Sequence, residues 1–260
     1  MAIELQTPAL FTGIGVALVS LFDEDGELLV DATAEHALAL VELGVAGVLV
    51  AGSTGEASAL DDDERANLID RVRRTLPPEI PVFAGTGQPS TRAAVATSLR
   101  AVDSGADALL VLSPPRTRDP RPYYDAITKA CPTTPVLAYH FPSVSAPGIE
   151  VDVLCPLPVV GCKDSSGDAT RLLDETQQFQ GAIYVGNPVL LALAGLLGLQ
   201  GAILAVANLD PALCARALAG DPHAQLQVAA LHHKTSSDFP NAIKQELHAR
   251  FDTPTGARLG

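Results

Sequence analysis

Short, unbroken apolar runs recur eight times along this chain of 260 residues, and this repetition constrains the fold more than any other feature. The runs cover residues 14–20, 46–51, 81–84, 108–112, 135–138, 158–162, 182–185 and 202–205. Their side chains do not alternate between apolar and polar, which is typical of parallel strands covered on both faces. Helical patterns lie between most of them, at 33–43, 62–75, 91–103, 123–130 and 169–179. Strand and helix alternating in this way predict an α/β fold, the (β/α)8 TIM barrel.

The pattern changes after residue 209. Helical patterns follow at 211–218, 223–236 and 241–250, with no further strand between them. We therefore expect a barrel over residues 1–209 and a short C-terminal helical extension over 210–260, packed on the barrel as a single domain. The competing doubly wound sheet is disfavoured, because Gly13-Ile14-Gly15 lacks the third glycine of the dinucleotide fingerprint.

The formal net charge of −13 argues against partners that carry a strong negative charge. Nucleic-acid surfaces need a basic stripe and anionic membranes attract basic segments, so we expect neither as a partner. The apolar stretch 189–207 approaches the length of a membrane span, but Gly198-Leu199-Gln200-Gly201 divides it, which favours a buried helix, a turn and a strand. The four cysteines form no CxxC pair and no export signal is visible, so we expect reduced thiols and a cytoplasmic location.

Lys163 is the residue most strongly indicated for chemistry. The chain has only four lysines, and Lys129, Lys234 and Lys244 lie in polar stretches with helical spacing, where we expect a solvated ammonium. Lys163 instead follows the apolar run 158–162, where a strand is expected to end and a loop to begin. An ammonium at such an edge is either solvated or desolvated with a lowered pKa, and the second case makes the amine a nucleophile.

The free energy needed to lower the pKa of Lys163 can be estimated. A free lysine has a pKa near 10.4, and lowering it to about 7–8 costs roughly 3–4 kcal/mol of differential solvation. We expect burial against Val159, Val160 and Cys162 to supply this without a cationic neighbour.

Two further strand ends carry polar groups that complement a lysine, because the carboxyl ends of barrel strands meet at one face. The segment Gly52-Ser53-Thr54-Gly55-Glu56 offers backbone N–H groups and hydroxyls suited to a carboxylate or phosphate, although a plain turn also explains it. Tyr139 offers a phenol that can move protons, although a lone tyrosine is more often a packing residue. Together with Lys163 these groups suit a 2-oxo acid whose carboxylate is held while its ketone is attacked.

Metal and serine-hydrolase chemistry have no support in the sequence. The six histidines are scattered or helical, and the adjacent pair His232-His233 points in different directions along a helix. No GxSxG segment occurs. We therefore expect no metal and no separate cofactor, because a covalent imine on Lys163 would carry the reaction.

Three segments in register resemble the signature segments of the dihydrodipicolinate synthase/N-acetylneuraminate lyase superfamily. They are Gly52–Glu56, Tyr139-His140-Phe141-Pro142-Ser143 and Gly161-Cys162-Lys163-Asp164-Ser165-Ser166-Gly167-Asp168. The resemblance extends from about Gly13 to Asn208, and more loosely to 240–247. It implies a Schiff-base lyase that handles pyruvate on a (β/α)8 barrel without a metal, usually as a homotetramer. For this chain we expect a homo-oligomer, either a dimer or a tetramer.

The resemblance also implies roles by position. Lys163 would form the imine and Tyr139 would be the acid/base residue. The implied substrate-binding positions are Ser53, Thr54, Ser165, Gly186 and Ile203. Among these, Ser53 and Thr54 would bind the carboxylate, and Ile203 would present its backbone carbonyl near the imine.

Two departures from the synthases bear on the substrate. The segment Ser113-Pro114-Pro115-Arg116 lacks the tyrosine pair whose second member completes a proton relay across a dimer interface, and Tyr123 and Tyr124 lie too far along the chain to replace it. Val144 stands where the synthases place an arginine for a second carboxylate. A buried carboxylate without that partner would lose about 2–5 kcal/mol.

Three functional hypotheses follow. The leading one is an aldolase of carbohydrate metabolism that cleaves or forms a 2-keto-3-deoxy sugar acid, with pyruvate as product or substrate. The alternative is a dihydrodipicolinate-synthase-like synthase or a hydro-lyase that uses the same imine. A reading of another class is a non-catalytic barrel that binds an oxo acid, suggested by the missing loop tyrosine.

Overall fold

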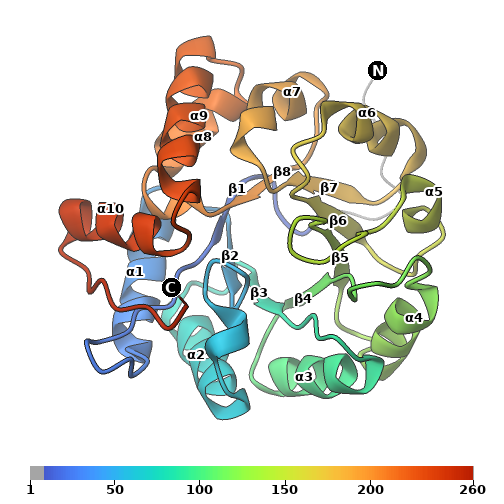
Figure 1. The fold of residues 1–260 in the computed structure, drawn as a ribbon, viewed down its shortest axis with the longest axis horizontal. Helices are drawn as coiled ribbons and strands as arrows, with labels where there is room; N and C mark the ends of the chain where they lie inside the picture. Colours follow the sequence, from blue (N-terminus) through green and yellow to red (C-terminus); the bar gives the residue numbers. More distant parts are fainter. Residues whose placement is uncertain (1–8, 260) are drawn as a thin grey trace.

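The computed structural model describes residues 9–259, and it confirms the predicted (β/α)8 barrel. Eight parallel strands close into a ring in chain order, and β1 completes the ring by pairing with β8. The strands are β1 (Gly13–Ala17), β2 (Gly47–Val50), β3 (Val82–Gly85), β4 (Ala108–Leu112), β5 (Val136–His140), β6 (Gly161–Asp164), β7 (Ala182–Val185) and β8 (Gly201–Leu204). Figure 1 shows the strands at the centre of the molecule and the helices around them.

The helices lie close to the positions that the sequence predicts. They are α1 (Val30–Glu42), α2 (Asp62–Thr75), α3 (Thr91–Asp103), α4 (Arg121–Ala130), α5 (Val151–Leu154), α6 (Ala169–Gln178), α7 (Leu191–Leu196), α8 (Pro211–Leu218), α9 (Pro222–Ser236) and α10 (Asn241–Phe251). Short 3-10 turns are η1 (Ala57–Ala59), η2 (Pro188–Leu190) and η3 (Val206–Asn208). At the start of α2, Asp61 and Glu64 form a reciprocal capping box, which satisfies backbone N–H groups that the first turn leaves free.

The strands separate two apolar layers because their successive side chains point to opposite faces. The outer layer, between strands and helices, contains Cys162 and Val185. The inner layer fills the barrel and contains Tyr139, Tyr184 and Ile203. Lys163 follows Cys162 on β6, so its side chain points into the barrel.

Two glycines on the neighbouring strands β1 and β2 leave space for an aromatic plug inside the barrel. Phe11 precedes β1, and its ring stacks on Tyr184 with centroids 4.6 Å apart. A Cβ on Gly15 would lie 2.7 Å from the Phe11 ring, and one on Gly47 would lie 3.0 Å from it. The hydroxyl of Tyr184 donates to the Phe11 carbonyl at 2.9 Å, which fixes the plug in place. This end of the barrel is therefore closed, and substrate must enter at the carboxyl ends of the strands.

The C-terminal helices lie against the early part of the barrel, near α1 and β1 in Figure 1. A separate apolar cluster joins them to the segment after β1, and it consists of Val19, Leu21, Leu209, Ile243 and Leu247. Asn208 adds a polar clip, because its side-chain amide donates to the Ala17 carbonyl at 2.7 Å and its oxygen accepts from the Val19 N–H at 3.2 Å. The final residues then return toward β2 and α2 (Figure 1).

The apolar stretch 189–207 is divided as predicted, into η2, α7, a turn with Gly198 at a φ of 71° and β8. Between residues 9 and 259, no helix combines the length and apolar character that crossing a membrane requires. The four cysteines are free thiols: Cys131, Cys162 and Cys214 are buried, and Cys155 is half-buried.

Candidate active site

A cavity of about 390 Å³ opens at the carboxyl ends of the strands. Its lining comprises Ser53, Thr54, Tyr139, Phe141, Ser143, Lys163, Ser165, Ser166, Gly186, Asn187, Ala205, His232, Ser236 and Phe239. Six of the seven site residues predicted from the sequence are therefore brought together around one space. Ile203, the seventh, is 1% exposed and lies in the inner apolar layer with Tyr139.

Lys163 lies in β6, which ends one residue later at Asp164, so the strand end predicted at Lys163 is one residue short. Its side chain is 4% exposed. Burial alone lowers the pKa of the amine to about 7. The expected cause also needs correction, because Cys162 packs in the outer layer on the opposite face of the strand. The desolvation comes from inside the barrel, where the Tyr139 ring centroid lies 4.5 Å from Nζ.

Tyr139 is placed by strand register. β5 and β6 pair Tyr139 directly with Lys163, so both side chains rise from neighbouring strands at one level of the barrel. Burial raises the pKa of the phenol to about 12, and the hydroxyls of Ser165 and Ser53 oppose this rise. The Ser165 hydroxyl lies 3.5 Å from the phenol oxygen. At neutral pH the phenol is therefore protonated, which allows it to act first as an acid.

The segment Gly52–Glu56 forms a tight turn at the end of β2. The N–H groups of Gly55 and Glu56 are used inside the turn, by the carbonyls of Gly52 and Ser53 at 3.1 and 3.2 Å. In the part of the chain that the structure describes, no acceptor engages the N–H groups of Ser53 and Thr54. Free N–H groups beside two hydroxyls at the edge of a cavity can bind a carboxylate.

The cavity lining leaves no room for a side chain at Gly186. A Cβ at this position would lie 1.9 Å from the Ser165 hydroxyl oxygen and 2.9 Å from Lys163 Cε. Any side chain would therefore displace the lysine or fill the space above it. Glycine here keeps the amine accessible from the cavity.

The structure also bears on the two groups that the sequence lacks relative to the synthases, the loop tyrosine and the arginine at position 144. The hydroxyl of Tyr123 bonds to the backbone of Gln88, and that of Tyr124 donates to the Val111 carbonyl at 2.9 Å. Neither tyrosine reaches the cavity, as the sequence predicts. Val144 is 57% exposed and does not line the cavity, so this position holds no group for a second carboxylate.

Eight lining residues were not predicted as site residues from the sequence. Phe141, Ser143, Ser166 and Asn187 lie within or beside motifs that were recognised, and Ala205 directly follows β8. The other three, His232, Ser236 and Phe239, come from α9 and the segment after it. Helical spacing gave no signal for these three, because only the folding of the C-terminal helices over the barrel mouth brings them to the cavity. Burial, together with the neighbouring His233, lowers the pKa of His232.

Behind β6, an ion network holds Asp164, the residue after the lysine. The Arg171 guanidinium bonds Asp164 at 3.1 Å and Glu175 at 2.7 Å, and all three side chains are at most 10% exposed. The second oxygen of Asp164 accepts from the Ser166 N–H at 2.6 Å. The loop that follows Lys163 is therefore fixed by charge-assisted hydrogen bonds from α6.

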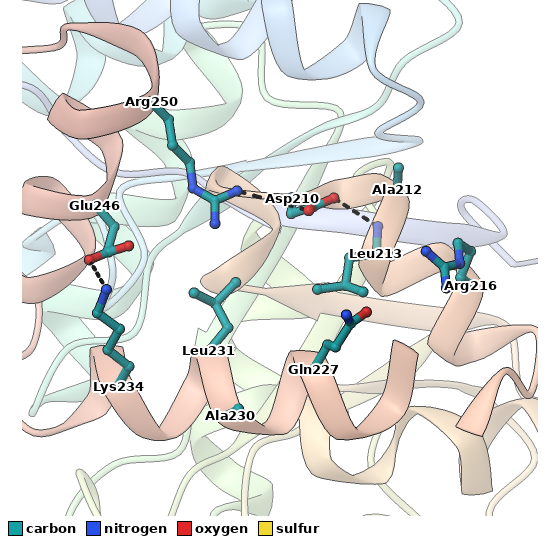
Figure 2. Close-up of a pocket in the computed structure, with 10 residues that line it drawn as sticks. All are labelled: Asp210, Ala212, Leu213, Arg216, Gln227, Ala230, Leu231, Lys234, Glu246 and Arg250. Carbon is teal, nitrogen blue, oxygen red and sulfur yellow. Dashed lines mark hydrogen bonds and ion pairs between the residues drawn. The ribbon is translucent and has the colours of Figure 1, made fainter. Parts of the chain in front are cut away.

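A second hollow lies between α8, α9 and α10, away from the strand ends (Figure 2). Four of its five charged side chains are engaged with one another: Lys234 pairs with Glu246, and Arg250 lies 3.9 Å from Asp210. Arg216, which also lines this hollow, pairs with Asp221 at 2.6 Å. Within residues 9–259, no group of three or more histidine, cysteine or acidic side chains is arranged to hold a metal ion.

Comparison with known proteins agrees with this geometry. A profile of the dihydrodipicolinate synthetase family matches residues 10–251. The 4-hydroxy-tetrahydrodipicolinate synthase of Thioalkalivibrio sulfidiphilus is 31% identical and covers 96% of this chain, which spans 91% of that protein. The enzyme of the same name from Pseudomonas aeruginosa is 31% identical, over 96% of this chain and 92% of its own length. The pyruvate-bound dihydrodipicolinate synthase of Acinetobacter baumannii superposes with a TM-score of 0.83 at 28% identity, covering 96% of this chain and 92% of that one.

Proposed function

This chain belongs to the dihydrodipicolinate synthetase family and is a carbon–carbon lyase, and we propose that it works through an imine between Lys163 and a 2-oxo acid of the pyruvate type. The neutral amine adds to the ketone carbon, and the resulting carbinolamine loses water to leave a protonated imine. In a substrate with a hydroxyl on C4, that hydroxyl gives its proton to the Tyr139 oxygen, and the electron pair of the C3–C4 bond passes into the imine, which leaves an enamine and an aldehyde. In the synthetic direction the pyruvate imine loses a C3 proton to the Tyr139 oxygen and becomes the enamine, whose carbon adds to the aldehyde while the same proton returns to the aldehyde oxygen.

The observation that carries this proposal is a buried amine that has no charged partner among residues 9–259. Desolvation is the sole cause of the lowered pKa of Lys163. A structural lysine at this depth would be paired with a carboxylate, as Lys244 is with Glu56. A pKa of about 7 makes the amine half neutral at physiological pH, the state required for attack on a carbonyl.

The surrounding residues are proposed to divide the remaining work. Ser53 and Thr54 bind the carboxylate of the oxo acid through N–H and hydroxyl groups. Tyr139 gives and takes the proton as the carbinolamine loses water. With no loop tyrosine in reach, the hydroxyls of Ser53 and Ser165 connect the phenol to the cavity. Ile203 offers its backbone carbonyl to the imine, and Ser165 and Gly186 border the rest of the substrate.

For the second substrate, the comparisons support the synthase-like alternative better than the sugar-acid hypothesis. The two bacterial relatives named above are both 4-hydroxy-tetrahydrodipicolinate synthases, and each matches nearly the whole chain. We therefore propose as the first candidate a synthase that adds the pyruvate enamine to an aldehyde, in the manner of these relatives.

One observation favours a sugar acid as the second candidate. Among the residues that line the cavity, only Lys163 and His232 can carry a positive charge. The other polar lining groups, including Ser143, Ser166, Asn187 and Ser236, are hydroxyls and an amide. Such neutral groups suit an aldehyde that bears hydroxyls better than one that bears a second carboxylate.

Reductive trapping tests the imine. Incubation with pyruvate and borohydride should add one reduced pyruvate adduct at Lys163, located by peptide mass spectrometry. Lys163→Ala should abolish the adduct, while Lys129→Ala, at a lysine in the last turn of α4, should keep it. An adduct that survives Lys163→Ala would overturn the proposal.

A panel of second substrates separates the two candidates. Pyruvate would be supplied with a carboxylated semialdehyde or with hydroxylated aldehydes, and 2-keto-3-deoxy sugar acids would be tested for pyruvate release. A product formed only from the semialdehyde supports the synthase, and pyruvate released only from sugar acids supports the aldolase of carbohydrate metabolism. Binding without turnover of any of them would favour the non-catalytic barrel.

The cytoplasmic location and the homo-oligomer stay predictions that accompany this function. Light scattering on the purified protein would distinguish a monomer from a dimer or a tetramer.

A further inference from the structure

One lysine has a different environment from the one that the sequence predicts. Lys244 lies in α10, and the expectation of a solvated ammonium there is wrong, because its side chain is 0% exposed. Its Nζ pairs with Glu56, also 0% exposed, and donates to the Gly256 carbonyl at 2.7 Å. The ammonium also lies 4.5 Å from the centroid of the Phe22 ring. A buried ion pair persists only when further hydrogen bonds satisfy both partners, so this arrangement is a built feature of the fold.

The C-terminal residues complete the coordination of Glu56. Its second carboxylate oxygen accepts from the backbone N–H groups of Arg258 and Leu259, both at 2.7 Å. We call residues 253–259 the C-terminal strap. The carboxylate thus accepts from α10 on one oxygen and from the strap on the other.

The Arg258 side chain ties the strap to the start of α2. Its guanidinium forms a fork with both carboxylate oxygens of Glu64 and donates to the Ala59 carbonyl at 2.9 Å. It also donates to the Gly26 carbonyl at 2.6 Å. These bonds fix the strap along the segment that follows β2, where the chain end lies in Figure 1.

Glu56 is the last residue of the turn that carries Ser53 and Thr54. Its backbone is left-handed, with a φ of 52°, and its N–H donates to the Ser53 carbonyl at 3.2 Å. From the barrel side, the Ser20 hydroxyl donates to the Gly55 carbonyl at 2.7 Å. The turn is therefore held on two sides, by Ser20 from the barrel and by Glu56 from the C-terminal end. A left-handed residue other than glycine costs strain, which the contacts of the Glu56 side chain offset.

We propose that Glu56 is a positioning residue, and that Lys244 and the C-terminal strap act through it to hold the Ser53–Thr54 turn in the shape that binds a carboxylate. This inference rests on the proposed role of the turn in binding the oxo acid. No residue of the strap lines the cavity, and the strap's hydrogen bonds do not reach Lys163, so we expect its effect on the binding of the carboxylate and not on the chemistry of the amine. Removing the strap leaves Glu56 without two donors and frees the turn to change its conformation.

Reductive trapping with pyruvate and borohydride tests this in the full-length protein and two variants. One variant ends after Asp252, and the other is Arg258→Met, which keeps the backbone donors but loses the guanidinium bonds. The half-saturating pyruvate concentration should rise about tenfold or more in the truncated protein and less in Arg258→Met, while the maximal trapping rate and its pH midpoint stay near the wild-type values. Arg250→Met is the matched control, because Arg250 is a partly exposed arginine of α10 and should leave all three quantities unchanged.

The outcomes separate this inference from the proposed function. If the wild-type protein forms no adduct, the proposed function fails. If it does, an unchanged half-saturating concentration in folded strap variants overturns the inference alone. A fall in maximal rate without a rise in that concentration also overturns it, because it would indicate damage to the amine site. Should the truncated protein fail to fold, Arg258→Met decides the question.

Discussion

The amine of Lys163 lies 4.5 Å from the centroid of the Tyr139 ring, and strand register pairs the two residues directly across β5 and β6. The ring face favours a cation, whereas burial disfavours one. The lowered pKa of Lys163 indicates that burial prevails. The same ring therefore shields the neutral amine before reaction and faces the cationic imine afterwards, so one contact serves both charge states.

The first prediction concerns the pH dependence of trapping. With a pKa of about 7, the neutral fraction of Lys163 rises from roughly one tenth at pH 6 to nine tenths at pH 8. At limiting pyruvate, the rate of adduct formation should follow this fraction and level off above pH 8. Intact-protein mass spectrometry over a pH series measures the rate. A rate that keeps rising tenfold per pH unit through pH 9 would show that the pKa of Lys163 is that of a solvated lysine.

The second prediction follows from the same lowered pKa and concerns stability. The amine has a pKa of 10.5 when unfolded and about 7 when folded, so between these values the unfolded chain binds more protons. The free energy of unfolding contributed by this group therefore rises with pH from 7 to 10.5 and is least favourable below 7. Lys163→Met should remove that dependence and stabilise the protein near pH 7 by a few kcal/mol, because each pH unit between the two pKa values corresponds to roughly 1.4 kcal/mol. Denaturant unfolding at pH 6.5 and 9 checks this, and a destabilised variant at pH 6.5 would contradict it.

The third prediction concerns Gly186. An alanine Cβ there would lie 1.9 Å from the Ser165 oxygen and 2.9 Å from Lys163 Cε. Gly186→Ala should therefore slow trapping by about tenfold or more, because the lysine must move to accommodate the methyl group. The double variant Gly186→Ala/Ser165→Ala removes the shorter contact, so the methyl group should slow trapping less when it is added to Ser165→Ala than when it is added to the wild type. Equal rates in Gly186→Ala and the wild type would contradict this, because they would show that Ser165 and Lys163 make room for the methyl group without loss of reactivity.

The barrel could be predicted from the sequence because continuous apolar runs and helical spacing are local signals. The helices at 62–75 and 91–103 have the predicted bounds. The end of β6 was predicted one residue early because the prediction followed the apolar run. The ladder continues to Asp164, whose polar side chain is satisfied behind the strand by Arg171 of α6.

The pyruvate half of the site could be predicted because each of its residues lies in a motif at a strand end. The rest could not, because His232 and Ser236 reach the cavity only through the packing of α9. Lys244 was misjudged for a related reason. Its neighbours on α10 are polar, and nothing local reveals a carboxylate 188 positions earlier in the chain.

The fourth prediction assigns His232 to the second substrate. Its lowered pKa keeps the imidazole neutral at pH 7, a state that can both donate and accept hydrogen bonds. His232→Leu should raise KM for the aldehyde or sugar acid by roughly 10-fold to 100-fold, while pyruvate trapping stays near the wild-type rate. His233→Leu is the matched control, since His233 does not line the cavity. Equal effects of the two substitutions would exclude this assignment.

The fifth prediction compares two lysines of the C-terminal helices. Lys244 and Glu56 are each 0% exposed, whereas Lys234 pairs with Glu246 at 63% exposure. Lys244→Met leaves a buried carboxylate without its cation, which should lower the free energy of unfolding by about 3–5 kcal/mol. Lys234→Met removes a solvated pair and should cost less than about 1 kcal/mol.

Urea unfolding of both variants beside the wild type measures the difference between these two pairs. The double variant Lys244→Met/Glu56→Gln removes the stranded charge and should regain part of the loss, because a neutral amide is less costly to bury than a carboxylate. If Lys244→Met and Lys234→Met were equally mild, the buried pair would contribute no more than a surface one. The proposal that Lys244 holds the Ser53–Thr54 turn through Glu56 would then lose its support.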